Sequence, residues 1–378
     1  MNLSQLNRNA EKIINQISNL NDKISNVQSQ LNQIQKIILK ETNINIPKLN
    51  IIHKKEDYKE PKSFQLLNDF TINSNTSRNK YDVLCVFKSS NSILYLVYPN
   101  YNIIIIYNLI DKKKILEIKD AHLTEIIHIS HLYDERNNLN LLMSASVDNG
   151  KVTIKIWNSH NFECINNIQI KNPHNIYFSF LKHITGNFCL VGICNYQNNS
   201  INAYYSNKGL AKKFIIEEKS DMYCLKVYNS KDSKNYILAG LYGLVLSIDF
   251  NTGLINDFRE QEKGKYHQYL NILEEDNATK LIDGCNTCIN IWDFHNRNLL
   301  MKISLDEIYS LCIWNNNILL VGGENKIYII NLNYGIIIDE IHGHNKVINI
   351  KKFVHPSYGS CLISQGEQND FIFVRKVN

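Results

Sequence analysis

Paired cysteines are the first residues in this sequence whose spacing could support chemistry. Cys285 and Cys288 form a C-x-x-C pair, and Cys189 and Cys194 lie close together upstream. Two thiolates can begin a zinc site, but zinc needs four ligands and no second close pair accompanies the C-x-x-C. The pair also falls on an expected hairpin turn instead of a helix start, which argues against a thioredoxin-like redox role. We interpret these cysteines as small buried hydrophobic residues and predict neither a metal nor a cofactor.

Other catalytic patterns are missing from the sequence. Its twelve histidines form no His-Glu-x-x-His pattern, and there is neither a Ser-His-Asp ordering nor a glycine-rich phosphate loop after a strand. Residues 322–326 (GGENK) lie on an expected hairpin turn and lack P-loop spacing. The lysines at 112–114 and 212–213 are short clusters near turns, where solvated loops are a simpler interpretation than phosphate binding. The sequence therefore predicts a protein that is not an enzyme.

Composition and charge argue against nucleic acid and membrane partners. The chain has 378 residues, 44% of them hydrophobic, and a formal net charge of +5. About +3 of this charge lies in residues 1–40, so the rest is too nearly neutral to attract nucleic acid through a global field. Nine cysteines without framework spacing fit a reducing compartment. No segment resembles a signal peptide and no apolar run could span a bilayer, so we expect a cytoplasmic protein.

Residues 1–42 are expected to form a coiled-coil helix. Apolar residues recur there at intervals of three and four over five heptads, which is the seam of a left-handed coiled coil. A helix with one apolar stripe cannot be stable alone, so it should pair with a second copy of the chain or with a coiled coil of another protein. The alternative is a helix that lies on the folded body of its own chain. Residues 43–62, which include Pro47 and many charges, are expected to form a linker. The residues that we expect to mediate oligomerisation are Leu6, Ile13, Ile17, Leu20, Ile24, Val27, Leu31, Ile34 and Ile38.

The remaining residues, 63–378, repeat a short strand pattern. Residues 289–293 (INIWD) alternate apolar and polar side chains, and weaker versions end at Trp157, Ile248 and Ile330. With Tyr107 and with Tyr204 or Tyr205 at the corresponding places, these positions lie about 38 to 50 residues apart, a spacing that accommodates four short strands and three turns. The pattern predicts an all-β fold, a β-propeller of seven blades.

The last expected blade lacks one strand. It begins at Gly343 and His344, supplies strands near residues 347–353, 360–364 and 371–376, and then the sequence ends. Residues 64–72 form an otherwise unassigned strand-like run just before the first blade. An unpaired strand edge is a liability, so we predict that this run supplies the outer strand of the last blade and closes the ring.

Residues 63–378 resemble the WD-repeat family. The second blade carries most of its motif, with His122 at the place of the family's Gly-His and then Ser144, Asp148 and Trp157. The resemblance implies that these four side chains form a hydrogen-bonded relay that stiffens the blade, as buried polar groups require partners. Two further blades keep part of the motif, although Val374 stands near the Trp place of the last one. Their expected relay residues are Trp292, Asp293 and His344.

Two specialised functions of that family find little support in the sequence. Propellers that bind phosphoinositides carry a Phe-Arg-Arg-Gly motif, which is absent. Propellers that dock on cullin ligases often place Arg two residues after the Trp-Asp pair, where this sequence has His295 and His160.

The resemblance implies a non-enzymatic scaffold, in which a coiled coil joins chains and each propeller binds partner proteins. The order of parts also resembles the autophagy scaffold that combines a coiled coil with a propeller. A G-protein beta subunit, whose helix pairs with another chain, is a further alternative, and a propeller enzyme is the least favoured. Tyr242, Tyr266 and Tyr334 lie on expected turns and are candidate partner-binding residues, because exposed aromatic side chains are good anchors.

Overall fold

A computed structural model of the chain describes part of its residues. These are 66–73, 83–89, 92–134, 139–171, 175–183, 185–194, 199–206, 209–259, 265–276, 278–367 and 371–377. Contacts divide the chain into two units, Met1–Lys59 and Glu60–Asn378, and every described residue belongs to the second. The expected coiled coil (1–42), its seam residues and the expected linker (43–62) lie outside the described residues.

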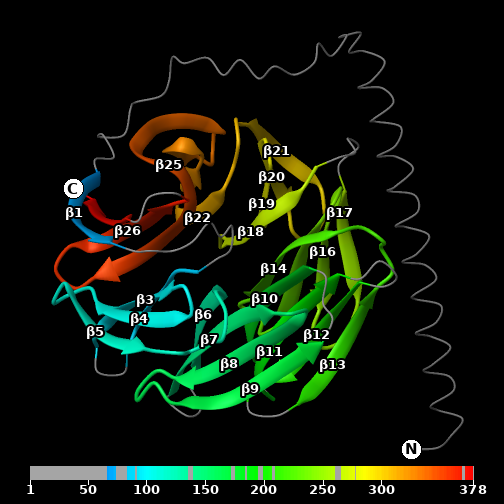
Figure 1. The fold of residues 1–378 in the computed structure, drawn as a ribbon. Coiled ribbons are helices and arrows are strands. Elements are labelled where there is room, and N and C mark those ends of the chain that lie inside the picture. Colours follow the sequence, from blue (N-terminus) through cyan, green and yellow to red (C-terminus); the bar gives the residue numbers. More distant parts are fainter. Residues whose placement is uncertain are drawn as a thin grey trace, which may run out of the picture. The chain divides into compact units, whose positions relative to one another are not determined.

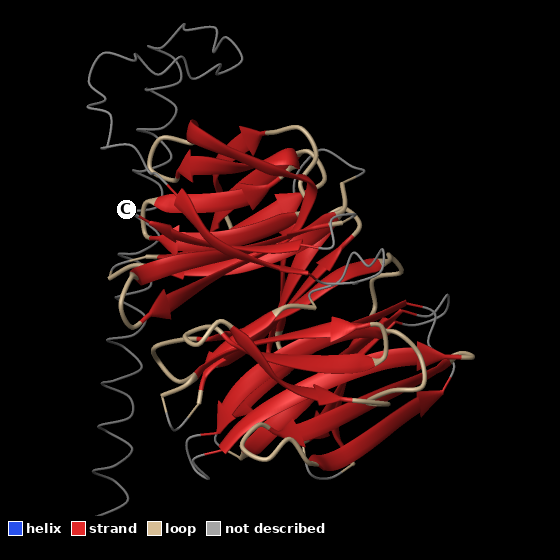
Figure 2. Cartoon of the chain, turned by 60° about the vertical axis from the view of Figure 1, so that its left-hand side comes forward, coloured by secondary structure: helices blue, strands red, loops and turns tan. Residues whose placement is uncertain are grey.

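All elements of the described residues are strands (Figure 2). Five of the sheets have four antiparallel strands in chain order, and we number them as blades one to five (Figure 1). Blade one consists of β2 (Cys85–Lys88), β3 (Leu94–Asn100), β4 (Ile103–Asn108) and β5 (Lys113–Ile118). Blade two consists of β6 (Ile126–Asp134), β7 (Leu139–Asp148), β8 (Lys151–Asn158) and β9 (Cys164–Lys171). Blade three consists of β10 (Asn175–His183), β11 (Gly186–Cys194), β12 (Asn199–Tyr205) and β13 (Leu210–Ile216). Blade four consists of β14 (Met222–Asn229), β15 (Asn235–Leu241), β16 (Leu244–Asp249) and β17 (Ile255–Arg259). Blade five consists of β18 (His267–Glu274), β19 (Thr279–Cys285), β20 (Cys288–Asp293) and β21 (Leu299–Ser304).

The sixth sheet has seven strands because one long strand serves two groups. Strand β25 (Ile336–His355) pairs with β24 through residues 336–346 and with β26 through residues 347–355. Blade six is therefore β22 (Ser310–Asn315), β23 (Ile318–Gly322), β24 (Glu324–Asn331) and the first part of β25. Blade seven is the second part of β25 with β26 (Gly359–Gly366), β27 (Phe371–Val377) and β1 (Leu66–Asn73). The sequence predicted a separate element beginning at Gly343 and His344, but the backbone stays extended through Gly343, at a φ of 143°.

The outer strand of blade seven comes from the other end of the chain. Strand β1 pairs antiparallel with β27, from Leu66 opposite Val377 to Asn73 opposite Phe371. In Figure 1 the blue β1 accordingly lies beside the red strands at the C-terminus. Strand β1 overlaps residues 64–72, the run expected to supply this strand, and it ends one residue later.

The strands form where apolar residues alternate along the chain. In β8 the side chains of Val152, Ile154 and Ile156 are buried on one face, while Thr153 and Lys155 face the other way. The repeated pattern of the sequence falls on the third strand of blades two, four, five and six, as β8, β16, β20 and β24. These strands pack deep within their sheets because both of their edges are paired.

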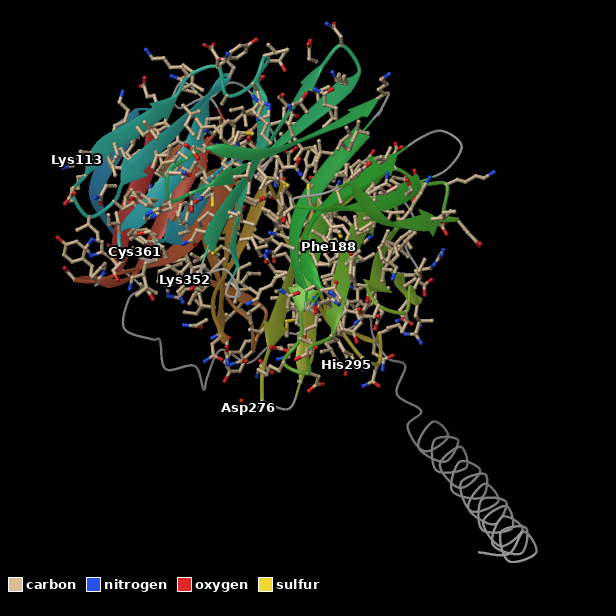
Figure 3. The ribbon with its side chains drawn as sticks, turned by 90° about the horizontal axis from the view of Figure 1, so that it is seen from below. Lys113, Phe188, Asp276, His295, Lys352 and Cys361 are labelled. Atoms are coloured by element: carbon tan, nitrogen blue, oxygen red, sulfur yellow. The ribbon has the colours of Figure 1, made fainter. Side chains whose placement is uncertain are left out.

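The core lies between neighbouring blades. Each hydrophobic cluster of the described residues joins two consecutive blades. In one of them Phe188 of β11, labelled in Figure 3, packs against Phe250, which follows β16. Another cluster joins blade seven to blade one, with Ile72 and Ile363 against Leu96. Sheet-on-sheet packing therefore continues around the molecule and returns to its starting point.

Candidate functional site

The first strands of blades two to seven surround a central cavity of about 710 Å³. Each blade repeats the same strand order, so the turns between second and third strands, and the loops that precede first strands, lie at one end of this cavity. We call this the Tyr242 end, after the residue in the turn between β15 and β16. Turns between third and fourth strands lie at the opposite end.

The Tyr242 end of blade two holds a hydrogen-bonded chain. Nε1 of Trp157 donates to Oγ of Ser144 over 2.8 Å, and Oγ of Ser144 lies 2.7 Å from Nε2 of His122. The other ring nitrogen of His122, Nδ1, lies 2.8 Å from Oγ of Ser146. Burial lowers the pKa of His122 to about 3, with a further contribution from the charge of Lys155. The histidine is therefore neutral and links the loop before β6 to β7, which Ser144 in turn links to Trp157 of β8.

The fourth position of this chain differs from the expected one. The structure brings His122, Ser144 and Trp157 together, but Ser146 and not Asp148 hydrogen-bonds to Nδ1 of His122. Asp148 ends β7 and is partly exposed. Ser146 could have been found from the sequence, because residues two apart on a strand share a face.

Blade seven builds a similar chain with an arginine in the place of the tryptophan. Nε2 of His344 lies 2.9 Å from Oγ of Ser364, and Nη1 of Arg375 donates to the same oxygen. Leu362 pairs with Arg375 as Leu142 pairs with Trp157 in blade two. Arg375 therefore stands at the tryptophan place itself, next to Val374, which the sequence placed near it.

Arg375 is a guanidinium enclosed by the fold. It is 2% exposed, lies 4.6 Å from the ring centre of Phe373, and burial lowers its pKa to about 10. Burial, together with this charge, lowers the pKa of His344 to about 3. Nδ1 of His344 has no hydrogen-bond partner, since Gly366 stands where blade two has Ser146.

In blade five the expected pair Trp292 and Asp293 does not join a relay. Trp292 is buried against Phe258, and its Nε1 has no hydrogen-bond partner. Asp293 lies at the opposite end of β20, where its Oδ1 accepts backbone N–H bonds from His295 and Asn296. The backbone and side-chain bonds from Asn296 lower the pKa of Asp293. This aspartate therefore stabilises the turn into β21, whose residue His295 is labelled in Figure 3.

The Tyr242 end of blade five instead carries His267, Asp283 and Cys285. Nδ1 of His267 lies 2.7 Å from Oδ2 of Asp283, and Sγ of Cys285 lies 3.6 Å from the same nitrogen. Cys285 and Cys288 are buried, as expected, and so is Cys189, whose thiol pKa is raised by burial. Sequence reasoning considered the C-x-x-C alone and missed His267 and Asp283, which only strand pairing brings beside it.

Two of the three candidate tyrosines meet beside Tyr223, a residue that lines the cavity. Tyr242 and Tyr266 form an isolated β-bridge with ring centres 5.3 Å apart, and the ring of Tyr223 lies edge-on to Tyr266 at 5.0 Å. Tyr242 and Tyr266 are 43% and 38% exposed, and Tyr223 lines the cavity. Tyr334 is also exposed but lies in the turn between β24 and β25, at the opposite end. We call Tyr223, Tyr242 and Tyr266 the tyrosine cluster.

The cavity wall carries positive charge. Lys226 of β14 and Lys351 of β25 line it, together with His128 and His131 of β6. Burial lowers the pKa of His131 to about 4, so this imidazole is neutral and the lysines provide the charge. None of the described residues that line the cavity is an aspartate or a glutamate. The cavity therefore favours anionic groups over cationic ones.

Comparison with known proteins identifies the fold. No protein-family model and no curated protein matches the sequence. Among solved structures, a chain of the mitotic checkpoint complex matches 88% of this chain, over 99% of its own length, with a TM-score of 0.63 and 12% identity. BBS1N, solved in complex with ARL6DN, matches 84% of this chain and 98% of its own, with a TM-score of 0.64 and 12% identity. The fold is a β-propeller.

A further match differs in length. Raptor from Chaetomium thermophilum matches 84% of this chain with a TM-score of 0.63 and 12% identity, but the match covers only 29% of Raptor. At such identities the similarity concerns the fold alone. Separately, the described residues contain no helix that is long and apolar enough to cross a membrane.

Proposed function

We propose that this protein is a non-enzymatic, cytoplasmic scaffold with a seven-bladed WD-repeat propeller in residues 63–378 that binds partner proteins. Residues 1–42 form a coiled coil that joins chains, and residues 43–62 connect the two parts. When a coiled coil holds propellers together, binding of one propeller to a repeated target raises the effective concentration of the next propeller near that target. Strong overall binding then requires no tight single site.

The tyrosine cluster beside the lysine-lined cavity is the observation that supports this function most directly. Tyrosine presents a large rigid surface and a hydroxyl, which makes it a frequent anchor in protein interfaces. Lys226 and Lys351 line the adjacent cavity. We infer that the partner inserts a segment that carries carboxylate groups, because complementary charge selects partners.

The comparisons are compatible with this proposal. BBS1N and the chain of the mitotic checkpoint complex were both solved together with other proteins. An enzyme of propeller type would instead be expected to place several carboxylates or metal ligands around its axis. The described cavity wall offers lysines, tyrosines and amides, which favours binding over catalysis.

Capture of partners by the full-length chain tests the docking surface. The double variant Tyr242→Ser, Tyr266→Ser should lose partners that co-purify with the wild type from native cells. The matched control is Tyr334→Ser, which removes an equally exposed tyrosine at the opposite end and should retain them. Equal retention by both variants would place the docking surface elsewhere on the propeller.

Light scattering on the full-length chain tests the coiled coil separately. A homomeric coiled coil predicts a mass of two or more chains, and Ile17→Asp with Ile24→Asp should reduce it to one. The control, Asn19→Asp with Asn26→Asp, adds the same charges on the outer face of the helix and should leave the mass unchanged. A wild-type monomer would instead favour a heteromeric partner helix, as in the G-protein-beta alternative, over a homomeric scaffold of the autophagy type.

A further inference from the structure

The group of His267, Asp283 and Cys285 is enclosed in blade five, and the scaffold function makes no use of it. All three residues are at most 1% exposed. Sγ of Cys285 lies 3.6 Å from Nδ1 of His267 and 3.9 Å from Oδ2 of Asp283, and the nitrogen and oxygen are 2.7 Å apart. The nitrogen, oxygen and sulfur therefore converge on one point, as the ligands of a metal ion do.

Blade two holds other side chains at the corresponding positions. The strand registers place Asp283 where blade two has Ser144, and Cys285 where it has Ser146. Hydroxyl groups at these places exchange hydrogen bonds with a histidine. A carboxylate and a thiol there are ligands that zinc binds.

We propose that His267, Asp283 and Cys285 bind a zinc ion, with Cys288 as the fourth ligand. A tetrahedral zinc ion with ordinary bond lengths holds its nitrogen, oxygen and sulfur ligands roughly 3.3–3.6 Å apart. The two distances from Cys285 are already close to this range. The shorter distance between His267 and Asp283 is a hydrogen bond, and zinc would replace its proton and separate the two atoms by roughly half an ångström.

Cys288 is placed to complete the set. Gly284 pairs with Ile289, so Cys285 and Cys288 stand opposite each other across the two-residue turn 286–287. Both thiols contact the amide of Asn290: Sγ of Cys285 accepts from Nδ2 over 3.4 Å, and Sγ of Cys288 lies 3.9 Å from Oδ1. The Cys288 side chain would have to turn toward the other three ligands to bind the same ion, because its sulfur does not yet converge with them.

With both thiols deprotonated, a dication would balance the charges of the site. Two thiolates and a carboxylate carry three negative charges, and Nζ of Lys265, 3.4 Å from Sγ of Cys288, supplies one positive charge. Zinc supplies the other two, and an interior site strongly favours such neutrality. Oδ1 of Asp283 has no hydrogen-bond partner, and neither has Nε1 of Trp292 on the neighbouring strand. The indole N–H of Trp292 is therefore a donor available to hydrogen-bond to the carboxylate of Asp283 when that carboxylate binds zinc.

Elemental analysis of the full-length chain, purified without chelators, provides the first test. We expect about one zinc ion per chain, and its removal should lower the melting temperature until zinc sulfate is added back. Cobalt added to the zinc-free chain should give a sulfur-to-cobalt charge-transfer band and the visible spectrum of a tetrahedral site. A folded chain that neither retains zinc nor gives this spectrum with cobalt overturns the proposal, and this test requires no variant.

Substitutions then assign the ligands. Cys285→Ser and Cys288→Ser should each lose most of the zinc, and each should weaken the cobalt band. The matched control is Cys189→Ser, which removes an equally buried thiol in contact with Met143 of blade two. This variant should retain the zinc and the full cobalt band. Zinc that persists in both blade-five variants, or a disulfide between Cys285 and Cys288 in the freshly purified chain, contradicts the assignment.

Discussion

At the scale of single residues, buried histidines should make the stability of the propeller depend on pH. The pKa of His122 and that of His344 are lowered to about 3 in the folded chain, from 6.5. The unfolded chain therefore binds protons below about pH 6.5 that the folded chain does not bind until about pH 3. The contribution of these neutral histidines to the stability of the folded chain is fully present above about pH 6.5, and it is lost as the pH falls toward about 3. We expect each histidine to account for a loss of about 2 kcal/mol between pH 7 and pH 5, measured by urea unfolding.

A single substitution distinguishes this effect from general acid sensitivity. His122→Gln should reduce the loss between the two pH values, whereas His160→Gln changes an exposed turn histidine and should not. A pH dependence that is the same in both variants would contradict the assignment to His122.

Arg375 provides a second prediction at this scale. Arg375→Ala should cost about 3 kcal/mol, because it opens a cavity and removes the donor to Ser364. Arg375→Trp should cost much less, since an indole occupies the same register position in blade two and carries no buried charge. Unfolding in guanidinium chloride measures the free energy of unfolding of both variants. An equal loss of stability in the two would show that position 375 specifically requires a guanidinium group.

The sequence predicted the members of the hydrogen-bonded side-chain groups in blades two and seven only where the residue type was diagnostic. Trp157, Ser144 and His122 stood out because of their spacing and their chemical types. Ser146 and Arg375 did not, because a serine is common in any strand and an arginine suggests an exposed position. Their roles depend on strand register, which the sequence fixes only to within a residue or two, and an error of one residue moves a side chain to the opposite face.

At the scale of elements, β1 should contribute to stability through its inward face. Ile72 is 6% exposed and packs with Ile363 and Ile372, whereas its neighbour Thr71 is exposed. Ile72→Ala should therefore cost about 2–4 kcal/mol. Thr71→Ala, the control on the same strand, should change stability by less than about 0.5 kcal/mol. Thermal unfolding monitored by circular dichroism measures the difference, and equal effects would argue against packing of β1 on the core.

Gly343 lies in the part of β25 that belongs to blade six, three residues before Lys346, the last residue paired with β24. Its φ of 143° is accessible almost only to glycine, and an added Cβ would lie 3.1 Å from Nη2 of Arg375. Gly343→Ala should therefore cost more than Gly359→Ala, which has a φ of 71° but nothing within 4 Å of the added carbon. We expect roughly 1–2 kcal/mol for the control and more for Gly343→Ala, both from chemical denaturation. A smaller loss at Gly343 would show that the strand can bend elsewhere.

The number and order of the strands could be anticipated better than their continuity. The repeat spacing indicated four strands per unit, and counting them left one place to fill near the C-terminus. Gly343 and His344 suggested a break because glycine usually marks turns. Here the same freedom lets the strand remain extended, which only the structure reveals.

At the scale of the whole molecule, the cavity should make partner binding sensitive to charge. Lys226 and Lys351 belong to different blades but line the same cavity. Changing both to Gln should weaken binding of a captured partner on the order of tenfold and reduce its dependence on salt. The control replaces Lys113 and Lys213, which are exposed on the outer strands β5 and β13, and should have little effect. Binding equilibria at two ionic strengths measure the change, and equal behaviour of the two variants would exclude the cavity from recognition.

The single strand that blades six and seven share has a consequence for how the molecule opens. Elsewhere a loop separates neighbouring blades, so one can fray while the next keeps its hydrogen bonds. Strand β25 offers no such loop, because Lys346, the last residue paired with blade six, is followed directly by Val347, the first residue paired with blade seven. Blade seven also contains the strand contributed by the opposite chain terminus. Amide protons of these two blades should therefore exchange with solvent as one cooperative unit.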